Sequence, residues 1–156
     1  MAIAQISTAT PDSKWKFFLN YQGGHNSDTT TLNQFDLVLT GTITDKFSVG
    51  FNATDQMVKY INTNSWWGAA LYLNIDPSPK FGATLRAEYF DNKDAVSAAP
   101  ATSLFNLTLS PNFKIGNLTI IPELRFESAK DEIFFDKDGA GTKSTFTGLL
   151  AATYHF

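Results

Sequence analysis

Apolar and polar residues alternate along most of this chain, and no other feature restricts its fold as strongly. Between residues 47 and 54, Phe47, Val49 and Phe51 alternate with Ser48 and Gly50. Successive side chains of a β-strand point to opposite faces, so a period of two predicts strands with one apolar and one polar face. The alternating segments are roughly ten residues long, which is the length that a tilted strand needs to cross a bilayer.

The alternation recurs in eight segments, and an even number of antiparallel strands is typical of bacterial membrane barrels. We therefore predict an all-β fold, an eight-stranded antiparallel up-and-down transmembrane β-barrel over residues 13–156. Residues 1–12 are expected to form a flexible segment outside it. The predicted strands lie at residues 14–22, 34–43, 47–54, 67–75, 81–89, 105–109, 118–127 and 145–156.

The predicted connections alternate in length. Tight turns are expected at residues 44–46, 76–79 and 115–117, and longer polar loops at residues 23–31, 56–64, 91–102 and 129–143. Short turns at one rim and long loops at the other are typical of outer-membrane barrels. With eight strands, both termini would lie at the rim of the short turns.

The apolar face of the strands could point outward to lipid or inward to a core. A soluble lipocalin-like ligand-binding barrel has the same alternation but turns its apolar face inward. The membrane is favoured because the polar face consists mostly of small residues, whereas soluble surfaces carry more Lys and Glu. Aromatic residues also lie near the strand ends, as in the two girdles of a membrane barrel. These residues are Trp15, Phe17, Phe47, Phe81 and Tyr154 near the short turns, and Tyr21, Phe35, Trp67, Tyr89, Phe105, Phe126 and Phe146 near the long loops.

The last predicted strand places Leu150, Ala152, Tyr154 and Phe156 on one face and has an aromatic end. This pattern resembles the C-terminal signal that the bacterial barrel-assembly machinery reads. We therefore expect that machinery and the lipid bilayer as partners of a monomeric chain.

Composition excludes several other classes of protein. Charged residues make up 17% of the chain, whereas soluble domains carry about 25%. The net charge is −3 and the basic residues are scattered, so we expect no nucleic-acid partner. The chain has no cysteine, which excludes thiol catalysis, disulfides and thiolate metal sites. No apolar run reaches the roughly 18 to 20 residues of a membrane helix.

The charged residues of the polar face are expected to line the lumen. An unpaired ion enclosed in a barrel costs several kcal/mol, so we predict a network of ion pairs. An eight-stranded barrel is just wide enough for side chains to fill it, which favours a closed lumen over an ion-selective constriction. The predicted members of the network are Lys16, Asp36, Arg86, Glu88, Glu123, Arg125 and Glu127.

Two loop motifs contain residue types that can carry chemistry. His25 lies near Ser27 and Asp28, but a general base must face a nucleophile, and neighbours in one loop rarely do so. Residues 136–141 loosely resemble a calcium loop but lack the Glu at its twelfth position. We therefore expect solvated turns, no enzyme activity, no metal site and no cofactor.

Several segments resemble the OmpL-like outer-membrane porins, or beta-barrel porin 2. They are Trp67-Gly68-Ala69-Ala70-Leu71-Tyr72, Leu85-Arg86-Ala87-Glu88-Tyr89-Phe90-Asp91, Ile121-Pro122-Glu123-Leu124-Arg125-Phe126 and Phe134-Phe135. The resemblance covers most of the chain from Lys14 on. It implies the C-terminal portion of a longer porin in the outer membrane of a Gram-negative bacterium.

Two functions follow as expectations. The chain is a small membrane-spanning barrel with a mostly filled polar lumen and at most weak ion passage. Alternatively, it is a segment of a larger diffusion porin that conducts small solutes only in the longer parent or in an oligomer.

Overall fold

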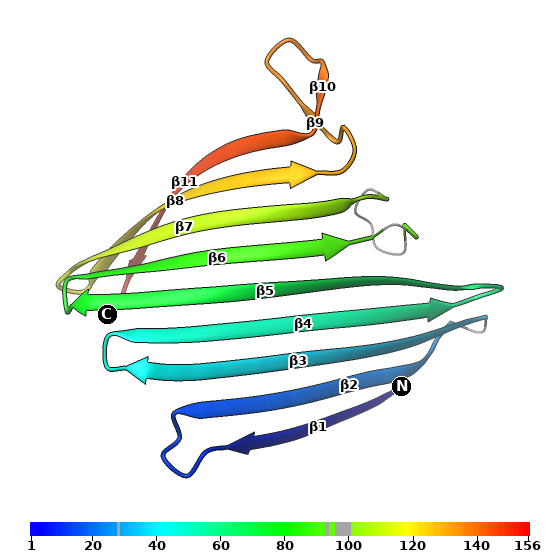
Figure 1. Ribbon diagram of the computed structural model, residues 1–156, viewed down its shortest axis with the longest axis horizontal. Helices are drawn as coiled ribbons and strands as arrows, with labels where there is room; N and C mark the ends of the chain where they lie inside the picture. Colours follow the sequence, from blue (N-terminus) through cyan, green and yellow to red (C-terminus); the bar gives the residue numbers. More distant parts are fainter. Residues whose placement is uncertain (28, 93, 96–100) are drawn as a thin grey trace.

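The computed structural model describes residues 1–27, 29–92, 94–95 and 101–156. One antiparallel sheet runs through them with its strands in sequence order, β1-β2-β3-β4-β5-β6-β7-β8-β11, and a hairpin of β9 and β10 projects beyond it (Figure 1). The bounds are β1 Ala2–Ala9, β2 Trp15–Ser27, β3 Thr30–Thr44, β4 Phe47–Lys59, β5 Thr63–Ser78, β6 Phe81–Asp91, β7 Ser103–Ile115, β8 Leu118–Ala129, β9 Phe134–Phe135, β10 Gly141–Thr142 and β11 Ser144–Tyr154.

The sheet begins one strand earlier than the sequence predicts. Residues 2–9, expected as part of a flexible segment, form β1 and pair with β2 from Ala2 opposite Gly23 to Ala9 opposite Lys16. Alternation is weak in β1, because Ala2, Ala4 and Ala9 distinguish its two faces poorly. The prediction of eight strands was therefore wrong: the described sheet has nine.

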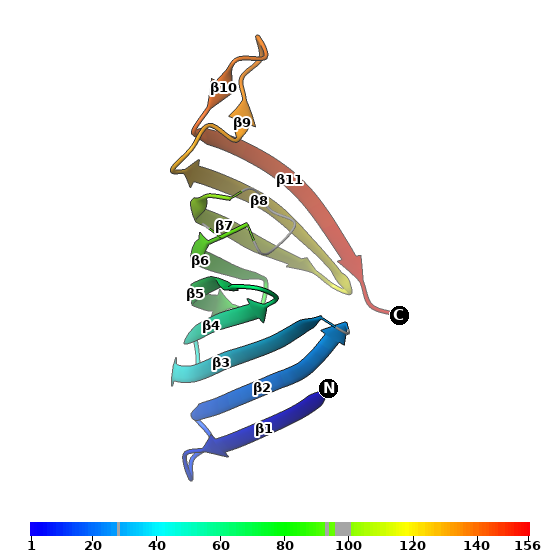
Figure 2. The same ribbon diagram turned by 90° about the vertical axis from the view of Figure 1, so that its right-hand side faces the viewer.

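The sheet is also open, which corrects the prediction of a closed barrel. In the described part of the chain β1 pairs only with β2, and β11 pairs with β8 and no further strand of the sheet. Figure 2 shows a curved sheet whose two edges stand apart. Because the strand number is odd, β1 and β11 run in the same direction. The N-terminus therefore lies at the rim of the long loops and the C-terminus at the rim of the short turns (Figure 1).

The strands are longer than predicted, and two loops expected to be long are short. β2 and β3 pair as far as Ser27 opposite Thr30, and β4 and β5 as far as Lys59 opposite Thr63. These outer segments do not separate polar from apolar residues, because Leu32 and Val58 lie on the polar face and Asn33 and Ser65 on the apolar face. They therefore leave no alternating signal in the sequence. The connections from β6 to β7 and from β8 to β11 remain long, and the latter contains β9 and β10.

The β1–β2 turn is organised by one carboxylate. The Thr10 hydroxyl and the Lys14 backbone N–H donate hydrogen bonds to Asp12 Oδ1, with heavy-atom distances of 2.5 and 3.1 Å. The bond from Thr10, then that from Lys14, lowers the pKa of Asp12 below its usual value. Ser13 has a φ of 56°, which lets the chain reverse within a few residues.

The sheet has no apolar core. Among the described residues, Ala70 and Ala129 are the only buried hydrophobic ones. On the polar face Thr108 is 1% exposed, whereas Leu71 and Leu107 on the opposite face are 45% and 38% exposed. The polar face is therefore the enclosed one, which is the reverse of a lipocalin.

Candidate functional site: the polar face of the sheet

Two rows of hydrogen bonds cross the polar face at right angles to the strands. In the first, Gln5 donates to Asn20, and Asn20 and Thr54 donate to the two oxygens of Asp36, at 2.6, 2.8 and 2.8 Å. These residues come from β1, β2, β3 and β4 and stand opposite one another in the register. The Asp36 carboxylate thus satisfies both neighbours without an ion pair.

The second row lies two residues along the strands from the first, on the side of the long loops. Gln22 Nε2 and Gln56 Nε2 both donate to Gln34 Oε1, at 2.9 and 2.7 Å, and Trp66 Nε1 donates to Gln56 Oε1 at 2.9 Å. The sequence analysis missed both rows, because they depend on which residues face each other across strands. Once the register is known, amides at matching positions of consecutive strands are the signal.

The charges of the C-terminal half are arranged in layers along the strands. Arg86 on β6 and Arg125 on β8 stand at the same height, on either side of Thr108 on β7. Glu88 and Glu127 form the next layer toward the long loops, with Asn106 between them. Glu123 lies on the opposite side of the arginines and accepts a hydrogen bond from Ser110 at 2.9 Å.

Each of these arginines has a carboxylate two residues away on its own strand. Arg86 Nε lies 3.1 Å from Glu88 Oε2, and Arg125 Nη2 lies 3.9 Å from Glu123 Oε1. The Nε–H groups of both arginines are buried and make no hydrogen bond within the described chain, so neither pair has ideal geometry.

The structure forms only part of the ion-pair network predicted for the lumen. Arg86, Glu88, Glu123 and Arg125 pair as described, but within the residues that the structure describes Lys16 and Glu127 form no ion pair. A further pair joins Lys114 Nζ to Asp76 Oδ1 at 3.0 Å, near the short turns. The sequence pattern places Asp76 in a turn and ends the sixth predicted strand at residue 109, before Lys114, so neither residue was expected on the lumen face.

The apolar face carries the aromatic residues expected for the girdles. Ring centroids lie 5.1 Å apart for Tyr21 and Phe35 and for Trp67 and Tyr89. At the other end of the strands, the ring of Phe81 contacts that of Phe113 on β7 in a tilted arrangement, with centroids 5.3 Å apart. Phe113 was not among the predicted girdle residues. The other predicted girdle residues, Trp15, Phe17, Phe47, Phe105, Phe126, Phe146 and Tyr154, occupy this same face by register.

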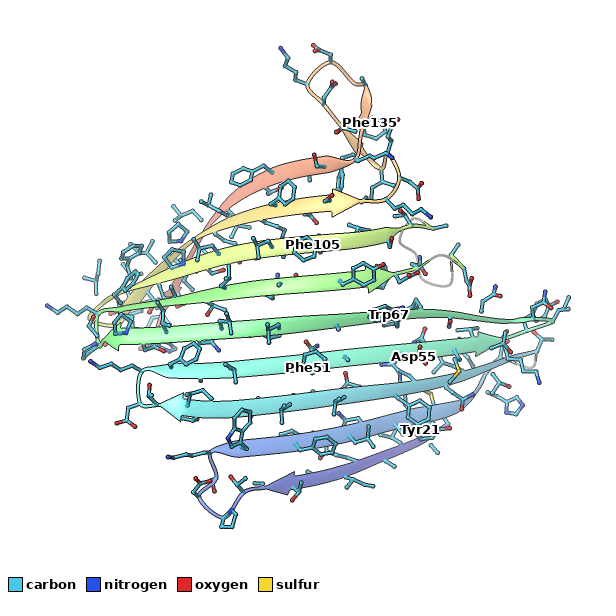
Figure 3. All side chains as sticks on the ribbon, in the orientation of Figure 1. Tyr21, Phe51, Asp55, Trp67, Phe105 and Phe135 are labelled. Carbon is cyan, nitrogen blue, oxygen red and sulfur yellow. The ribbon has the colours of Figure 1, made fainter. Side chains whose placement is uncertain are left out.

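One carboxylate interrupts the girdle near the long loops. Asp55 stands between Phe35 and Trp67 in the register, on the apolar face (Figure 3). The alternation after Ala53 places it there, but the sequence analysis ended the strand at Thr54. Its position at the end of the apolar band lets the carboxylate reach the water interface.

The residues of the predicted assembly signal lie on the open edge of the sheet. Leu150 and Tyr154 are 72% and 57% exposed, and β11 has β8 on one side only. Tyr154 and Phe156 contact each other with ring centroids 5.3 Å apart.

The two loop motifs are solvated in the described residues. His25 lies two residues before the end of β2, opposite Thr31, and is exposed, while Asp28, the third member of that motif, lies outside the described residues. Asp136 Oδ1 accepts hydrogen bonds from the N–H groups of Asp138 and Ala140, both at 2.9 Å, so it closes its own turn. In the described ranges no group of three His, Cys, Asp or Glu side chains is placed to hold a metal ion. The described residues also contain no helix with the length and hydropathy to span a membrane.

An all-antiparallel up-and-down sheet with an enclosed polar face and an exposed, aromatic-rimmed apolar face defines the class of β-barrel outer-membrane proteins. Residues 2–156 match the family described as "Putative beta-barrel porin-2, OmpL-like". The chain belongs to this porin family, and the match includes β1, where the sequence analysis found no resemblance. Searches of curated proteins and of solved structures found no match.

Proposed function

We propose that this sheet forms part of the wall of a diffusion porin in the outer membrane of a Gram-negative bacterium. The observation that supports this proposal is that one face of the sheet is polar and enclosed, whereas the other is apolar and exposed. On the enclosed face, side chains form one hydrogen-bonded row across β1 to β4 and another across β2 to β5. On the other face, Leu71, Leu107 and Leu124 are 38% to 48% exposed. Apolar patches of this extent require a partner, and lipid tails fit an aliphatic band between aromatic girdles.

The larger porin is favoured over a small closed barrel because of the two open edges. Unpaired backbone groups in hydrocarbon cost several kcal/mol each, so β1 and β11 need partner strands within the membrane. If β1 and β11 paired with each other to close the sheet, the two strands would be parallel. The pair would also be parallel if β11 of one copy joined β1 of a second copy in the same membrane orientation. An odd number of strands from outside this chain closes the barrel antiparallel throughout. Without them, we expect at most weak ion passage.

The same proposal covers the partners and the chemistry. The bilayer contacts the apolar face, and the barrel-assembly machinery reads the exposed side chains at the end of β11. The wall binds and guides solutes, and we propose no catalytic step. A soluble ligand-binding barrel remains the competing class of function, and it predicts the opposite facing.

Two adjacent tryptophans provide the test, because Trp66 lies on the polar face and Trp67 on the apolar face. Two variants would each retain one of them, with the other two tryptophans changed to Phe, and would be folded in micelles containing brominated lipid. We expect bromine to quench Trp67 and aqueous acrylamide to quench Trp66 preferentially. Equal quenching of the two residues by each agent, or the reverse order, would contradict the membrane facing.

A further inference from the structure

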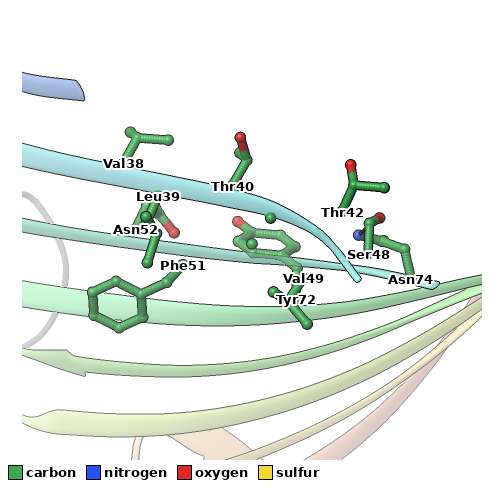
Figure 4. A pocket seen from close by; sticks show the side chains of 12 residues that line it. Val38, Leu39, Thr40, Thr42, Ser48, Val49, Phe51, Asn52, Tyr72 and Asn74 are labelled. Atoms are coloured by element: carbon green, nitrogen blue, oxygen red, sulfur yellow. Dashed lines mark hydrogen bonds between the residues drawn. The ribbon is translucent and has the colours of Figure 1, made fainter. Parts of the chain in front are cut away.

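A groove crosses the polar face from β3 to β7, and we call it the wall groove. It consists of two hollows of about 470 and 440 Å³, the first over β3, β4 and β5 and the second over β4 to β7. Asn52 and Tyr72 line both, so the hollows adjoin each other. Figure 4 shows the side chains of the first hollow, these two among them. Each hollow is within the size range of small-molecule sites.

The floor of the wall groove is built from aromatic rings laid on glycines. Tyr72 stands opposite Gly50 and Phe90 opposite Gly68. A Cβ at Gly50 would lie 3.4 Å from Tyr72 Cβ, and one at Gly68 would lie 3.4 Å from Phe90 Cδ2. The missing side chains let both rings approach the sheet, so that a ring face is available to the groove. Trp66 packs beside Phe90 with centroids 5.6 Å apart.

Several polar atoms of the wall groove have no partner in the described chain. Asn52 Oδ1 and Asn106 Oδ1 are buried and accept no hydrogen bond. The Tyr72 hydroxyl forms none of the hydrogen bonds found among the described residues. Buried amide oxygens are normally satisfied, so each of these two asparagine side chains gains a hydrogen bond if its amide turns and brings the enclosed oxygen to a donor on a water or a ligand in the groove.

The wall groove has almost no net charge. Among the described residues, Glu88 is its only acidic or basic lining side chain, and the Arg86 ion pair compensates it. An ionic ligand would therefore lose its hydration without gaining a free counter-charge. A neutral ligand with many hydroxyl groups and an apolar face fits better.

Resting on the porin role proposed above, we infer that the wall groove binds a neutral sugar. The C–H face of a pyranose ring packs on the Tyr72 ring, whose face is electron-rich. On binding, the side-chain amides of Asn52 and Asn106 turn toward the groove, and the sugar hydroxyls donate to their oxygens. Two adjoining hollows provide room for two sugar rings in sequence.

The experiment uses the variant that retains only Trp66, because this indole borders the wall groove and reports on it by fluorescence. The folded chain in detergent would be titrated with glucose and cellobiose, and with glucosamine and glucuronate as charged counterparts. We expect saturable binding of both neutral sugars and tighter binding of cellobiose. The variant that retains only Trp67 is expected to show no change, because that indole lies on the other face.

Substitutions identify the site. Tyr72→Ala is expected to weaken cellobiose binding by about five- to tenfold, the range of an aromatic stacking contact. Phe18→Ala removes a ring from the same face outside the wall groove and should leave binding unchanged. Asn52→Leu preserves the side-chain size and should also weaken binding, so the test stands if Tyr72→Ala does not fold.

The inference is overturned if neither neutral sugar gives a saturable change, if a charged sugar binds more tightly than glucose, or if Phe18→Ala weakens binding as much as the groove variants do. The quenching of Trp66 and Trp67 by bromine and acrylamide tests the membrane facing separately. A failed titration with the expected quenching would remove the sugar site alone.

Discussion

At the scale of single residues, the face of the sheet on which a side chain lies decides which substitutions that position tolerates. Leu85 and Thr84 are neighbours on β6, yet Leu85 stands between Leu73 and Leu109 on the apolar face, whereas the Thr84 hydroxyl donates to Asn74 Oδ1 at 2.8 Å on the polar face. The same substitution at the two positions therefore places a new side chain in two different solvents.

We predict that Leu85→Arg impairs insertion and that Thr84→Arg does so far less. An arginine on the lipid face at mid-depth costs about 2 to 4 kcal/mol, whereas at residue 84 its guanidinium reaches water. The folded fraction in lipid–detergent micelles, measured by gel mobility with and without heating, gives the comparison. Similar folded fractions for the two variants would show that the facing is wrong.

At the scale of strands, side-chain rows hold β1 to β5 in register. A shift of one residue would turn every side chain of a strand to the other face and would break these rows. Gln34 is central, because its single carbonyl oxygen accepts from both β2 and β4.

Gln34→Leu is therefore expected to destabilise the sheet by about 1 to 3 kcal/mol, since it leaves the amide donors of Gln22 and Gln56 without their acceptor. Urea unfolding in detergent measures this loss of free energy. Gln5→Leu, at the exposed edge and in a single side-chain bond, is the matched control and should cost much less. If the two substitutions had the same effect, the rows would contribute nothing specific.

At the scale of the whole molecule, the open edges determine how the barrel closes. β1 and β11 run in the same direction and do not pair with each other. A chain without cysteine allows this to be measured directly with pairs of introduced cysteines.

We predict that Ile6→Cys on β1 forms no disulfide with Leu150→Cys, Ala152→Cys or Tyr154→Cys on β11 within one chain in micelles. A disulfide requires Cα atoms about 4.4 to 6.8 Å apart, and strands at opposite edges of an open sheet are farther apart than that. The control pair, Ile6→Cys with Leu19→Cys, joins residues that face each other on β1 and β2 and should oxidise readily. Efficient oxidation between β1 and β11 would indicate a closed nine-stranded barrel.

Much of this architecture is readable from the sequence. The alternation assigns Phe35, Leu37 and Leu39 to one face and Gln34, Asp36 and Thr40 to the other, because the side-chain period of a strand is a local property. It also identifies the short turns between β3 and β4 and between β7 and β8. The family follows from the same segments, which the match over residues 2–156 confirms.

The tertiary structure alone decided the number of strands, the open edges and the partners of each polar side chain. β1 has little alternation and becomes a strand only through pairing with β2. Lys114 on β7 reaches Asp76 on β5 only because both strands pair with β6, one on each side of it. Pairing joins residues far apart in the chain, so a pattern with a period of two cannot specify which residues will face each other. The sequence by itself determined which side of the alternating strands β2 to β8 and β11 is polar, and register determined what those polar groups form together.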